Sequence, residues 1–450
     1  MTECNGQRLL FSSLGRQQVQ ADFAGGTLTS DAGGLLLREV DRRCGLLDAL
    51  TACLTDPRDP TRIVHHLRTM LAQRVYGLAL GYEDLNDHTT LRTDPLFAVL
   101  ADQRPDPAQP LASAPTLCRL ENRVTRASLA RMSAVLVEQF IASFDAPPEE
   151  LILDFDATDD PVHGMQEGRF FHGYYDHYCF LPLYVFCGAR LLVAYLRPSN
   201  IDASLHTRPI LKLLVRRLRQ AWPGVRIILR GDSGFCRWKL MRWCEQNDVF
   251  YVLGLARNAV LERLAAPFTA AAQAQFEATQ TKVRNFHDVR YAAKTWDRPR
   301  RVIVKAEHLA KGPNVRFVVT NLLTPTPAQM YDEWYVARGD MENRIKEQQL
   351  ALFADRTSCH AFLANQFRVL LSAAAYGLVE TLRRTALANT ELQTAQAGTI
   401  RLKLFKLAAR VVTSVRRVVF HLSSAYPLTR LFAHVLARLR RPYALRPAPS

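Results

Sequence analysis

Apolar residues in the first third of the chain recur with the spacing of helices. Between residues 62 and 80, and again between about 128 and 144, they repeat every three to four positions. That period places apolar side chains on one face of a helix. A further apolar-rich segment follows Ser30 and Asp31, two residue types that cap helix N-termini. The pattern predicts a mainly helical N-terminal region over residues 1–147.

The pattern changes at about residue 148. Short apolar runs rich in β-branched and aromatic residues now alternate with amphipathic stretches, which predicts the order strand, strand, strand, helix, strand, helix, strand. These elements are expected at 151–158, 180–188, 190–197, 204–222, 226–230, 237–247 and 249–255. The first three strands form an antiparallel meander, whereas the last two return through helices and should lie parallel. Residues 148–255 are thus predicted to form the first part of an α/β core with a mixed sheet.

Residues 256–327 interrupt this core. An alanine-rich stretch comes first, and short strand candidates follow at 289–293, 301–305 and 316–320. We therefore predict a mainly β insertion. Two long helices, 328 to about 352 and 360 to about 385, then complete the core over residues 328–388. The remaining residues, 389–450, form a strongly basic C-terminal region.

Charge narrows the choice of partner. The chain carries 58 Lys and Arg against 42 Asp and Glu, a formal charge of +16. Such an excess favours a polyanionic partner, nucleic acid or an anionic membrane surface, although basic proteins without a specific partner share it. In the C-terminal region, charge alternates with apolar residues over short runs and no membrane-lying amphipathic helix stands out, which favours DNA.

The cellular location follows from other features of the sequence. No run of about 18 apolar residues is free of charge, and the N-terminus lacks the pattern of a signal peptide. The nine cysteines form no C-x-x-C pair and no zinc-like cluster, which is typical of reduced thiols. We expect a cytoplasmic bacterial protein with no membrane partner.

Acidic residues stand where two of the predicted strands end. Asp154 and Asp156 are two positions apart and so share one face of a strand, where their repulsion needs a cation or hydrogen bonds. Asp232 follows the strand at 226–230 in a glycine-flanked turn. Ligands of open α/β sheets bind at the carboxyl ends of parallel strands. The alternative is that these acids are solvated loop residues, turn formers or helix caps.

A third acid lies in the helix predicted at 328–352. Tyr335, Arg338 and Glu342 are spaced i, i+3 and i+7 and share one stripe of that helix. Glu342 also precedes Lys346 by four residues, so a solvated surface pair is the alternative. Tyr335 and Arg338 could equally pack between the last two helices.

The order of these elements and acids resembles that of the RNase H-like transposases with a DDE site. One large group of bacterial insertion-sequence transposases carries Tyr-x2-Arg-x3-Glu-x6-Lys, which Tyr335, Arg338 and Glu342 match, whereas Gln349 replaces the lysine. The insertion-sequence family numbered thirteen-eighty is similar in three segments: DFDATDDPVHGMQEG, ILRGDSGF and ENRIKEQQL. The resemblance extends over about residues 150–385.

The resemblance implies a DNA transposase with an RNase H-like mixed sheet. It would cleave the ends of a mobile element and join them to target DNA, the cut-and-paste route. Asp156, Asp232 and Glu342 would be the catalytic residues and metal ligands, with Asp154 in reserve for the first position. Two Mg²⁺ ions, with Mn²⁺ as a substitute, suit carboxylate oxygens and in-line phosphodiester displacement. The alternatives are an RNase H-like nuclease without strand transfer and an inactive DNA-binding descendant.

Partner contacts are implied in the same way. Double-stranded DNA, as terminal inverted repeats and as target, would be bound by a homodimer across paired ends. Arg338 would bind phosphate, Tyr335 would bind the backbone or stack on a base, and Arg344 and Lys346 are further DNA-binding candidates. The N-terminal region is a DNA-end-binding module or a plain helical cap. Trp296 in the insertion is a platform for a flipped base or, more simply, a core residue.

Overall fold

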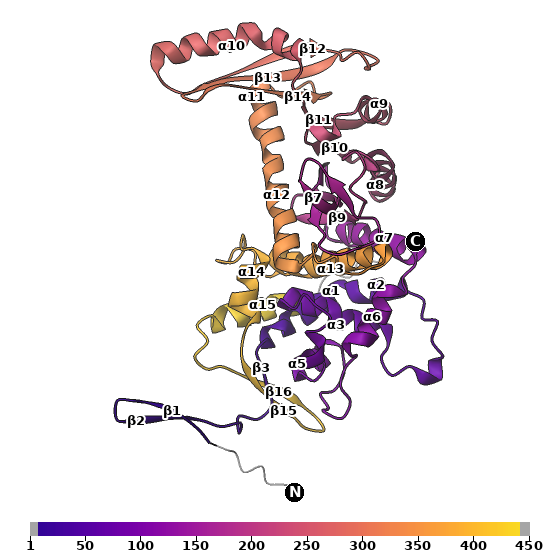
Figure 1. The fold of residues 1–450 in the computed structure, drawn as a ribbon, viewed down its shortest axis with the longest axis vertical. Helices are drawn as coiled ribbons and strands as arrows, with labels where there is room; N and C mark the ends of the chain where they lie inside the picture. The colour runs from indigo at the N-terminus through magenta and orange to yellow at the C-terminus, as the bar shows by residue number, and fades with distance from the viewer. Residues whose placement is uncertain (1–7, 442–450) are drawn as a thin grey trace. The chain divides into compact units, whose positions relative to one another are not determined.

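An eight-stranded mixed sheet organises the larger part of the chain in the computed structural model, which describes residues 8–441 (Figure 1). The chain divides into two compact units. One unit contains the sheet and comprises Thr125–Leu350 and Ala354–Ala373. The other contains the chain up to Val124, the short segment Ala351–Phe353 and the chain from Ala374 onward. Each unit is therefore built from more than one stretch of the chain.

The strands of the sheet run in the order β12-β13-β14-β11-β10-β4-β8-β9. Five strands form the centre and one side of the sheet: β11 (Val249–Leu255), β10 (Arg226–Gly231), β4 (Glu150–Ala157), β8 (Leu183–Cys187) and β9 (Arg190–Tyr195). β4, β8 and β9 pair antiparallel, whereas β4, β10 and β11 pair parallel. The predicted meander and the parallel strands after it are confirmed.

One predicted strand divides in two. The segment expected at 180–188 becomes β7 (His177–Phe180) and β8, with Pro182 between them. β7 pairs with β5 (Asp160–Pro161) and β6 (Phe170–His172) in a separate three-stranded sheet. Proline has no backbone N–H to offer a strand ladder, so it marks the boundary between the two sheets.

The two faces of the large sheet bury different side chains. On one face, apolar residues such as Leu153, Phe155 and Leu229 pack in a core with α8 (Thr207–Ala221), α9 (Trp238–Gln246) and α10 (Ala259–Thr279). On the other face, a smaller cluster contains strand residues and two residues of a long helix: Ile228, Val252, Ile303, Val318, Leu322, Met330 and Tyr331. Because side chains alternate along a strand, the residues between the core positions of β4 face this long helix.

The insertion contains the predicted strands and, before them, a long helix that the sequence pattern did not predict. Its alanine-rich part is α10, a helix of 21 residues, and three strands follow it: β12 (Val283–Tyr291), β13 (Arg300–Leu309) and β14 (Gly312–Thr320). Alanine is the strongest helix former, and Asn258 caps the helix by accepting from the backbone N–H groups of Val260 and Leu261. β14 pairs with β11, so the three strands extend the large sheet.

The first predicted long helix is continuous but irregular, and it carries five of the predicted site residues. Over Pro327–Ala351 it changes pitch several times: α11 (Pro327–Gln329), a π turn η4 (Met330–Tyr335), a 3-10 turn η5 (Val336–Arg338), α12 (Gly339–Lys346) and a second π turn η6 (Glu347–Ala351). Thr326 begins it in a capping box with Gln329. π turns inside helices occur frequently at functional sites.

The unit without the large sheet joins the two ends of the chain. Its helices include α1 (Leu35–Cys44), α3 (Leu67–Leu80), α5 (Pro95–Leu100), α6 (Ala114–Asn122) and α15 (Thr429–Arg440). Strand β15 (Ala409–Thr413) pairs with β3 (Leu28–Thr29) and with β16 (Val418–Leu422). The helices expected near 30–40 and 62–80 are confirmed, whereas the one expected at 128–144, α7 (Arg126–Ala142), belongs to the sheet unit.

One of the described helices passes a length and hydropathy test for crossing a membrane. α13 (Phe362–Thr385) has a mean hydropathy of 1.2 over 18 residues, but 83% of that window is buried inside the protein. This helix is not a charge-free apolar run of about 18 residues, because it contains Arg368. A mostly buried helix of this kind is equally typical of a protein core.

Candidate active site

Strand β4 points Asp154 and Asp156 toward the face that carries the long helix, because Leu153 and Phe155 occupy the core face. Asp154 is only 3% exposed. Its two carboxylate oxygens accept hydrogen bonds from Arg230, one of them at 2.7 Å to Nη2. Arg230 lies directly opposite Asp154 in the register of β4 and β10. The guanidinium of Arg230, on the neighbouring strand, therefore balances the negative charge of Asp154.

The same arginine also holds the helix in place. The Nη1 of Arg230 donates to the backbone oxygen of Trp334 at 2.7 Å. Trp334 precedes Tyr335, so this contact sets the position of the helical segment that carries the predicted stripe. Nothing in the sequence pattern marks Arg230 as a partner of Asp154, because the two residues are 76 positions apart.

Asp156 lies closer to solvent and has a different arginine partner. Its side chain is 15% exposed, and its Oδ2 accepts from Nη1 of Arg338 at 3.2 Å. Burial raises the pKa of Asp156 from 3.8 to about 7; Arg338 opposes this shift, and the negative charges of Asp232 and Glu342 add to it. With this pKa the carboxyl group is partly protonated at neutral pH, and a bound cation would favour its charged form.

Asp232 stands in the turn after β10, as predicted. Its Oδ1 accepts from the backbone N–H of Gly234 at 2.8 Å, and it begins the 3-10 turn η3 (Ser233–Phe235). One carboxylate oxygen of Asp232 therefore caps a turn, as the alternative interpretation of the sequence predicted. The negative charge of Asp232 still acts on Asp156, since it contributes to the raised pKa of that residue.

Gly254 lets the helix approach the Asp232 turn. A Cβ atom at this position would lie 2.6 Å from the hydroxyl of Tyr335 and 2.9 Å from the backbone nitrogen of Ser233. Only glycine leaves room for such an approach. Tyr335 is partly buried there, and its ring lies 5.6 Å from that of Tyr331.

Arg338 joins the first and third predicted acids. Its Nη2 donates to Oε1 of Glu342 at 2.7 Å, in addition to its bond with Asp156. The side chain of Arg338 is 17% exposed, and that of Glu342 is 49% exposed. The structure therefore gathers Asp156, Arg338 and Glu342 in direct contact, with Asp232 and Tyr335 beside them.

Two further DNA-binding candidates and the lysine position lie outside this cluster. Arg344 donates to the buried Glu347 at 3.2 Å, so its guanidinium is already engaged. Lys346 is exposed on the helix. Gln349 donates from Nε2 to the backbone oxygen of Asp159 at 2.9 Å. In this chain the lysine position is therefore used to tether the helix to the segment after β4.

The acids do not form a ready metal cage. Within residues 8–441, no three Asp, Glu, His or Cys side chains lie together in an arrangement that could hold an ion. The guanidinium of Arg338 occupies the space between Asp156 and Glu342 and provides the positive charge there. The donor set nevertheless fits a hard cation, because it consists of carboxylate oxygens and includes a carboxyl group of raised pKa.

Trp296 belongs to the packing of the insertion. It lies against the main core, with its ring 5.4 Å from that of Tyr291 and 5.5 Å from the guanidinium of Arg300. The core interpretation of this tryptophan is the one its contacts support.

Acids held at the carboxyl ends of two parallel strands, facing a helix with a third acid, define a carboxylate site of an α/β enzyme. Comparison with known families identifies which one. Residues 11–444 match the family described as Transposase DDE domain group 1, and the chain belongs to this family. It is a transposase of the DDE class.

Comparison with individual proteins adds little to the family match. None of the curated proteins is similar enough to the chain to count as a match. Among solved structures, the cryo-EM structure of the piggyBac transposase synaptic complex with hairpin DNA is similar, with 10% sequence identity and a TM-score of 0.44. That similarity covers 92% of this chain and 83% of the other.

Proposed function

We propose that this protein is a cut-and-paste DNA transposase whose RNase H-like core cleaves the ends of a bacterial insertion sequence and transfers them to target DNA. Asp156, Asp232 and Glu342 are the catalytic carboxylates of this proposal. The observation that supports it is the contact of Asp156 and Glu342 with one guanidinium, that of Arg338, although they lie 186 positions apart on a strand and a helix.

Divalent metal is part of the proposal. DDE transposases generally use divalent metal ions, and Mg²⁺, or Mn²⁺ in its place, would be held by Asp156, Asp232 and Glu342. Two bound ions supply stabilisation of the attacking and leaving oxygens of an in-line phosphodiester displacement. The negative charges of Asp232 and Glu342 both raise the pKa of Asp156, so Asp156 interacts with both of the other acids. Asp156 would hold metal together with Asp232 and Glu342.

The residues around the acids bind and orient DNA in this account. Arg338 pairs with Asp156 and Glu342, and a cation held by these carboxylates would supply that positive charge instead. The planar fork of Arg338 would then suit a phosphate near the scissile bond. Gly254 leaves room for Tyr335 beside the Asp232 turn. In this proposal the hydroxyl of Tyr335 donates to the DNA backbone near the same phosphate. Lys346 is exposed and adds a phosphate contact, whereas Arg344 acts through Glu347 on the helix.

The wider setting follows from charge and class. The formal charge of +16 suits double-stranded DNA, as terminal inverted repeats and as target. A homodimer across two paired ends, working in the bacterial cytoplasm, completes the proposal. A nuclease without strand transfer would share the carboxylates, and joining of a pre-cut element end to a plasmid separates the two functions.

The test is cleavage of a DNA fragment that carries an element end, identified by the inverted repeats flanking the coding region. Wild type in Mg²⁺ should nick at the end of the element, and EDTA should abolish nicking. Asp232→Asn should abolish it while DNA binding survives. Asp248→Asn makes the same charge change at an exposed residue with a left-handed backbone that asparagine tolerates, and it should cleave as wild type does. Unchanged nicking by Asp232→Asn would remove this residue from the site.

A further inference from the structure

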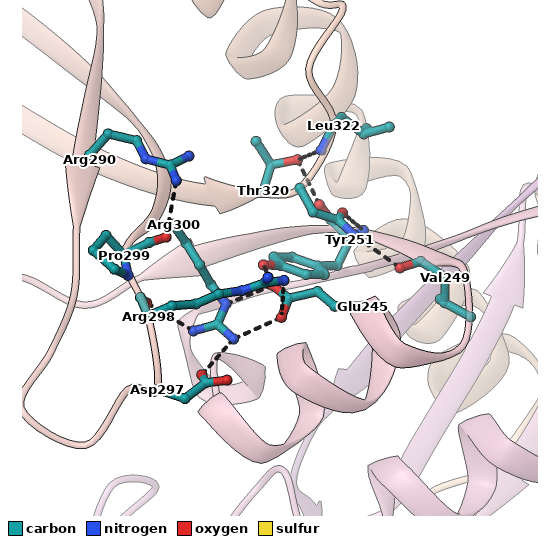
Figure 2. A network of polar contacts seen from close by, with 11 residues as sticks. Glu245, Val249, Tyr251, Arg290, Asp297, Arg298, Pro299, Arg300, Thr320 and Leu322 are labelled. Carbon is teal, nitrogen blue, oxygen red and sulfur yellow. Dashed lines mark hydrogen bonds and ion pairs between the residues drawn. The ribbon is translucent and has the colours of Figure 1, made fainter.

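A polar pocket lies on the β12–β14 side of the large sheet, away from the strands β4 and β10 that lead to Asp156 and Asp232. Its volume is about 200 Å³, and four arginines stand in its wall. The residues of interest are Glu245, Tyr251, Arg290, Arg298, Arg300 and Arg301, which we name the arginine pocket. Figure 2 labels all of them except Arg301. They come from α9, the start of β11, the end of β12, the start of β13 and, for Arg298, the loop between β12 and β13.

The order of the strands places this pocket away from the carboxylates. In the paired registers, Arg290 and Arg301 are level with Arg230, which precedes Asp232 by two residues. The separation therefore runs across the sheet: β12 lies four strands from β10, or about 20 Å at roughly 4.8 Å per strand.

The carboxylates near the pocket are already committed to particular arginines. Arg300, whose side chain is 2% exposed, donates to both oxygens of Glu245 at 2.7 and 2.9 Å and to Asp297 at 2.8 Å. Arg298 forms an ion pair with Glu245 at 2.8 Å. Since the hydroxyl of Tyr251 also donates to Glu245 at 2.7 Å, this carboxylate has no capacity left for another arginine.

Arg301 has its own acid, and Arg290 has none. Arg301 binds Asp288 through a bidentate contact, the shortest at 2.7 Å. Arg290 donates from Nη2 to the backbone oxygen of Pro299 at 3.3 Å, and no carboxylate of residues 8–441 lies within ion-pair distance of it. Figure 2 shows Arg298 and Arg300 reaching Glu245, whereas Arg290 points to the Pro299 carbonyl. The pocket thus holds four guanidinium groups against three carboxylates, and one positive charge remains.

The unpaired Arg290 is exposed and stands in a pocket whose wall includes one firmly held guanidinium. Arg300 is fixed by Glu245 and Asp297 and lies 5.5 Å from the ring centre of Trp296. Arg298, in contrast, is 58% exposed, so its guanidinium can turn toward a ligand. A preorganised pocket with one unpaired guanidinium and one accessible guanidinium suits a compact monoanion.

We propose that the arginine pocket binds one backbone phosphate of the DNA, contacted by Arg290 and Arg298. A phosphodiester carries the single negative charge that the pocket leaves unbalanced, and arginine forks match its oxygens. Contacts of this kind fix the register of a protein on a duplex without reading its sequence. The inference rests on the proposed function, because it requires that the chain bind DNA. It adds a contact remote from the carboxylates.

The experiment compares the salt dependence of binding to an element-end duplex by wild type, Arg290→Gln, Arg290→Lys and Arg263→Gln. Arg263 is exposed on α10, and its substitution makes the same charge change outside the pocket. Loss of one phosphate contact lowers the log–log salt slope by about one, so the affinity advantage of wild type over Arg290→Gln should shrink roughly threefold between 50 and 200 mM salt. Arg290→Lys should retain most of the slope, and Arg263→Gln should leave it unchanged.

A second arm locates the phosphate. Neutral methylphosphonate is placed at one backbone position at a time along the duplex. At one position, about six base pairs or more from the cleaved bond given the roughly 20 Å between the two sites, it should weaken wild type but not Arg290→Gln. Equal salt slopes for Arg290→Gln and Arg263→Gln, with wild type binding DNA normally, would overturn the pocket and leave the proposed function standing. Wild type that binds no DNA would overturn both.

Discussion

Two arginine–aspartate pairs lie on the same face of β4, two residues apart, and differ in almost every other respect. Asp154 is buried and bound through both oxygens by Arg230. Asp156 is more exposed and accepts a single bond from Arg338, which it shares with Glu342. Arg230 is fixed on the adjacent strand, whereas Arg338 comes from an irregular helix.

The difference between the pairs lies in what can replace the arginine. A buried bidentate pair between neighbouring strands is costly to break, because either partner left alone is an unpaired buried charge. A single contact at the edge of a cluster of three acids can be exchanged for a divalent cation. We infer that Asp154–Arg230 positions the helix through Trp334, and that Asp156–Arg338 is the pair that opens for chemistry.

The largest expected effect comes from removing the structural pair. Asp154→Ala leaves Arg230 buried without its carboxylate and should lower the free energy of unfolding by about 3–5 kcal/mol. Chemical denaturation of variants of each partner alone and of both together measures this change in the free energy of unfolding. The double variant Asp154→Ala/Arg230→Met should recover part of the loss. Additive losses would show that the two residues do not act as a pair.

The second prediction concerns the pH dependence of the other aspartate. The pKa of Asp156 is raised in the folded protein to about 7, so the native state binds a proton more tightly than the unfolded state does. Its contribution to stability is therefore present below about pH 4 and is lost as pH rises toward 7. In EDTA, Asp156→Asn should be more stable than wild type at pH 7.5, by on the order of 2–4 kcal/mol.

The comparison of wild type with Asp156→Asn across pH carries the test. The stability difference should shrink as pH falls from 7.5 to 4, and Mg²⁺ should reduce it at pH 7.5 by stabilising wild type alone. A difference that does not change with pH would show that Asp156 is not held with a raised pKa.

A smaller effect is expected at the contact between the helix and the Asp232 turn. Gly254→Ala places a methyl group within 3 Å of Tyr335 and Ser233 and should cost about 1–3 kcal/mol of stability. Gly224→Ala is the matched control, because a Cβ there meets nothing within 4 Å. Adding Tyr335→Phe, which removes the nearer atom, should restore part of the loss. No loss in Gly254→Ala would mean that the helix does not approach the turn so closely.

The smallest effect tests the exchange of Arg338 for metal. Arg338→Gln removes the competing cation from Asp156 and Glu342 and should tighten Mn²⁺ binding by roughly tenfold, or about 1.4 kcal/mol. Titration calorimetry with Mn²⁺ measures this in the absence of DNA. Arg344→Gln makes the same charge change on the same helix, where the arginine binds Glu347, and should leave the affinity unchanged. Weaker Mn²⁺ binding by Arg338→Gln would exclude the exchange.

The sequence predicted the central strands well because local patterns determine them. The strand expected at 249–255 is found at Val249–Leu255, where an apolar run is bounded by Asp248 in a left-handed conformation. Periodicity was less informative for 259–279, because an alanine-rich stretch shows little contrast between its faces. The π turns in the helix of Tyr335 and Glu347 depend on tertiary contacts and leave no mark in the pattern.

The sequence pointed to the candidate site residues but not to their partners. Alternation along β4 placed Asp154 and Asp156 on one face and could not separate them. What distinguishes them is the register that sets Arg230 opposite Asp154, which pairs residues far apart in the sequence. Gly254 was missed for the same reason, since the approach of Tyr335 is a property of the folded chain.

The most direct test of the account measures cleavage of element-end DNA in Mg²⁺ by wild type, Asp154→Asn and Asp156→Asn at equal folded fractions. Asp156→Asn should lose roughly 10³-fold in rate, since a metal-held carboxylate contributes several kcal/mol to transition-state stabilisation. Asp154→Asn, which keeps the shape and an acceptor for Arg230, should remain within about tenfold of wild type. Loss of cleavage in Asp154→Asn with activity retained in Asp156→Asn would contradict the assignment of Asp156 as the first carboxylate.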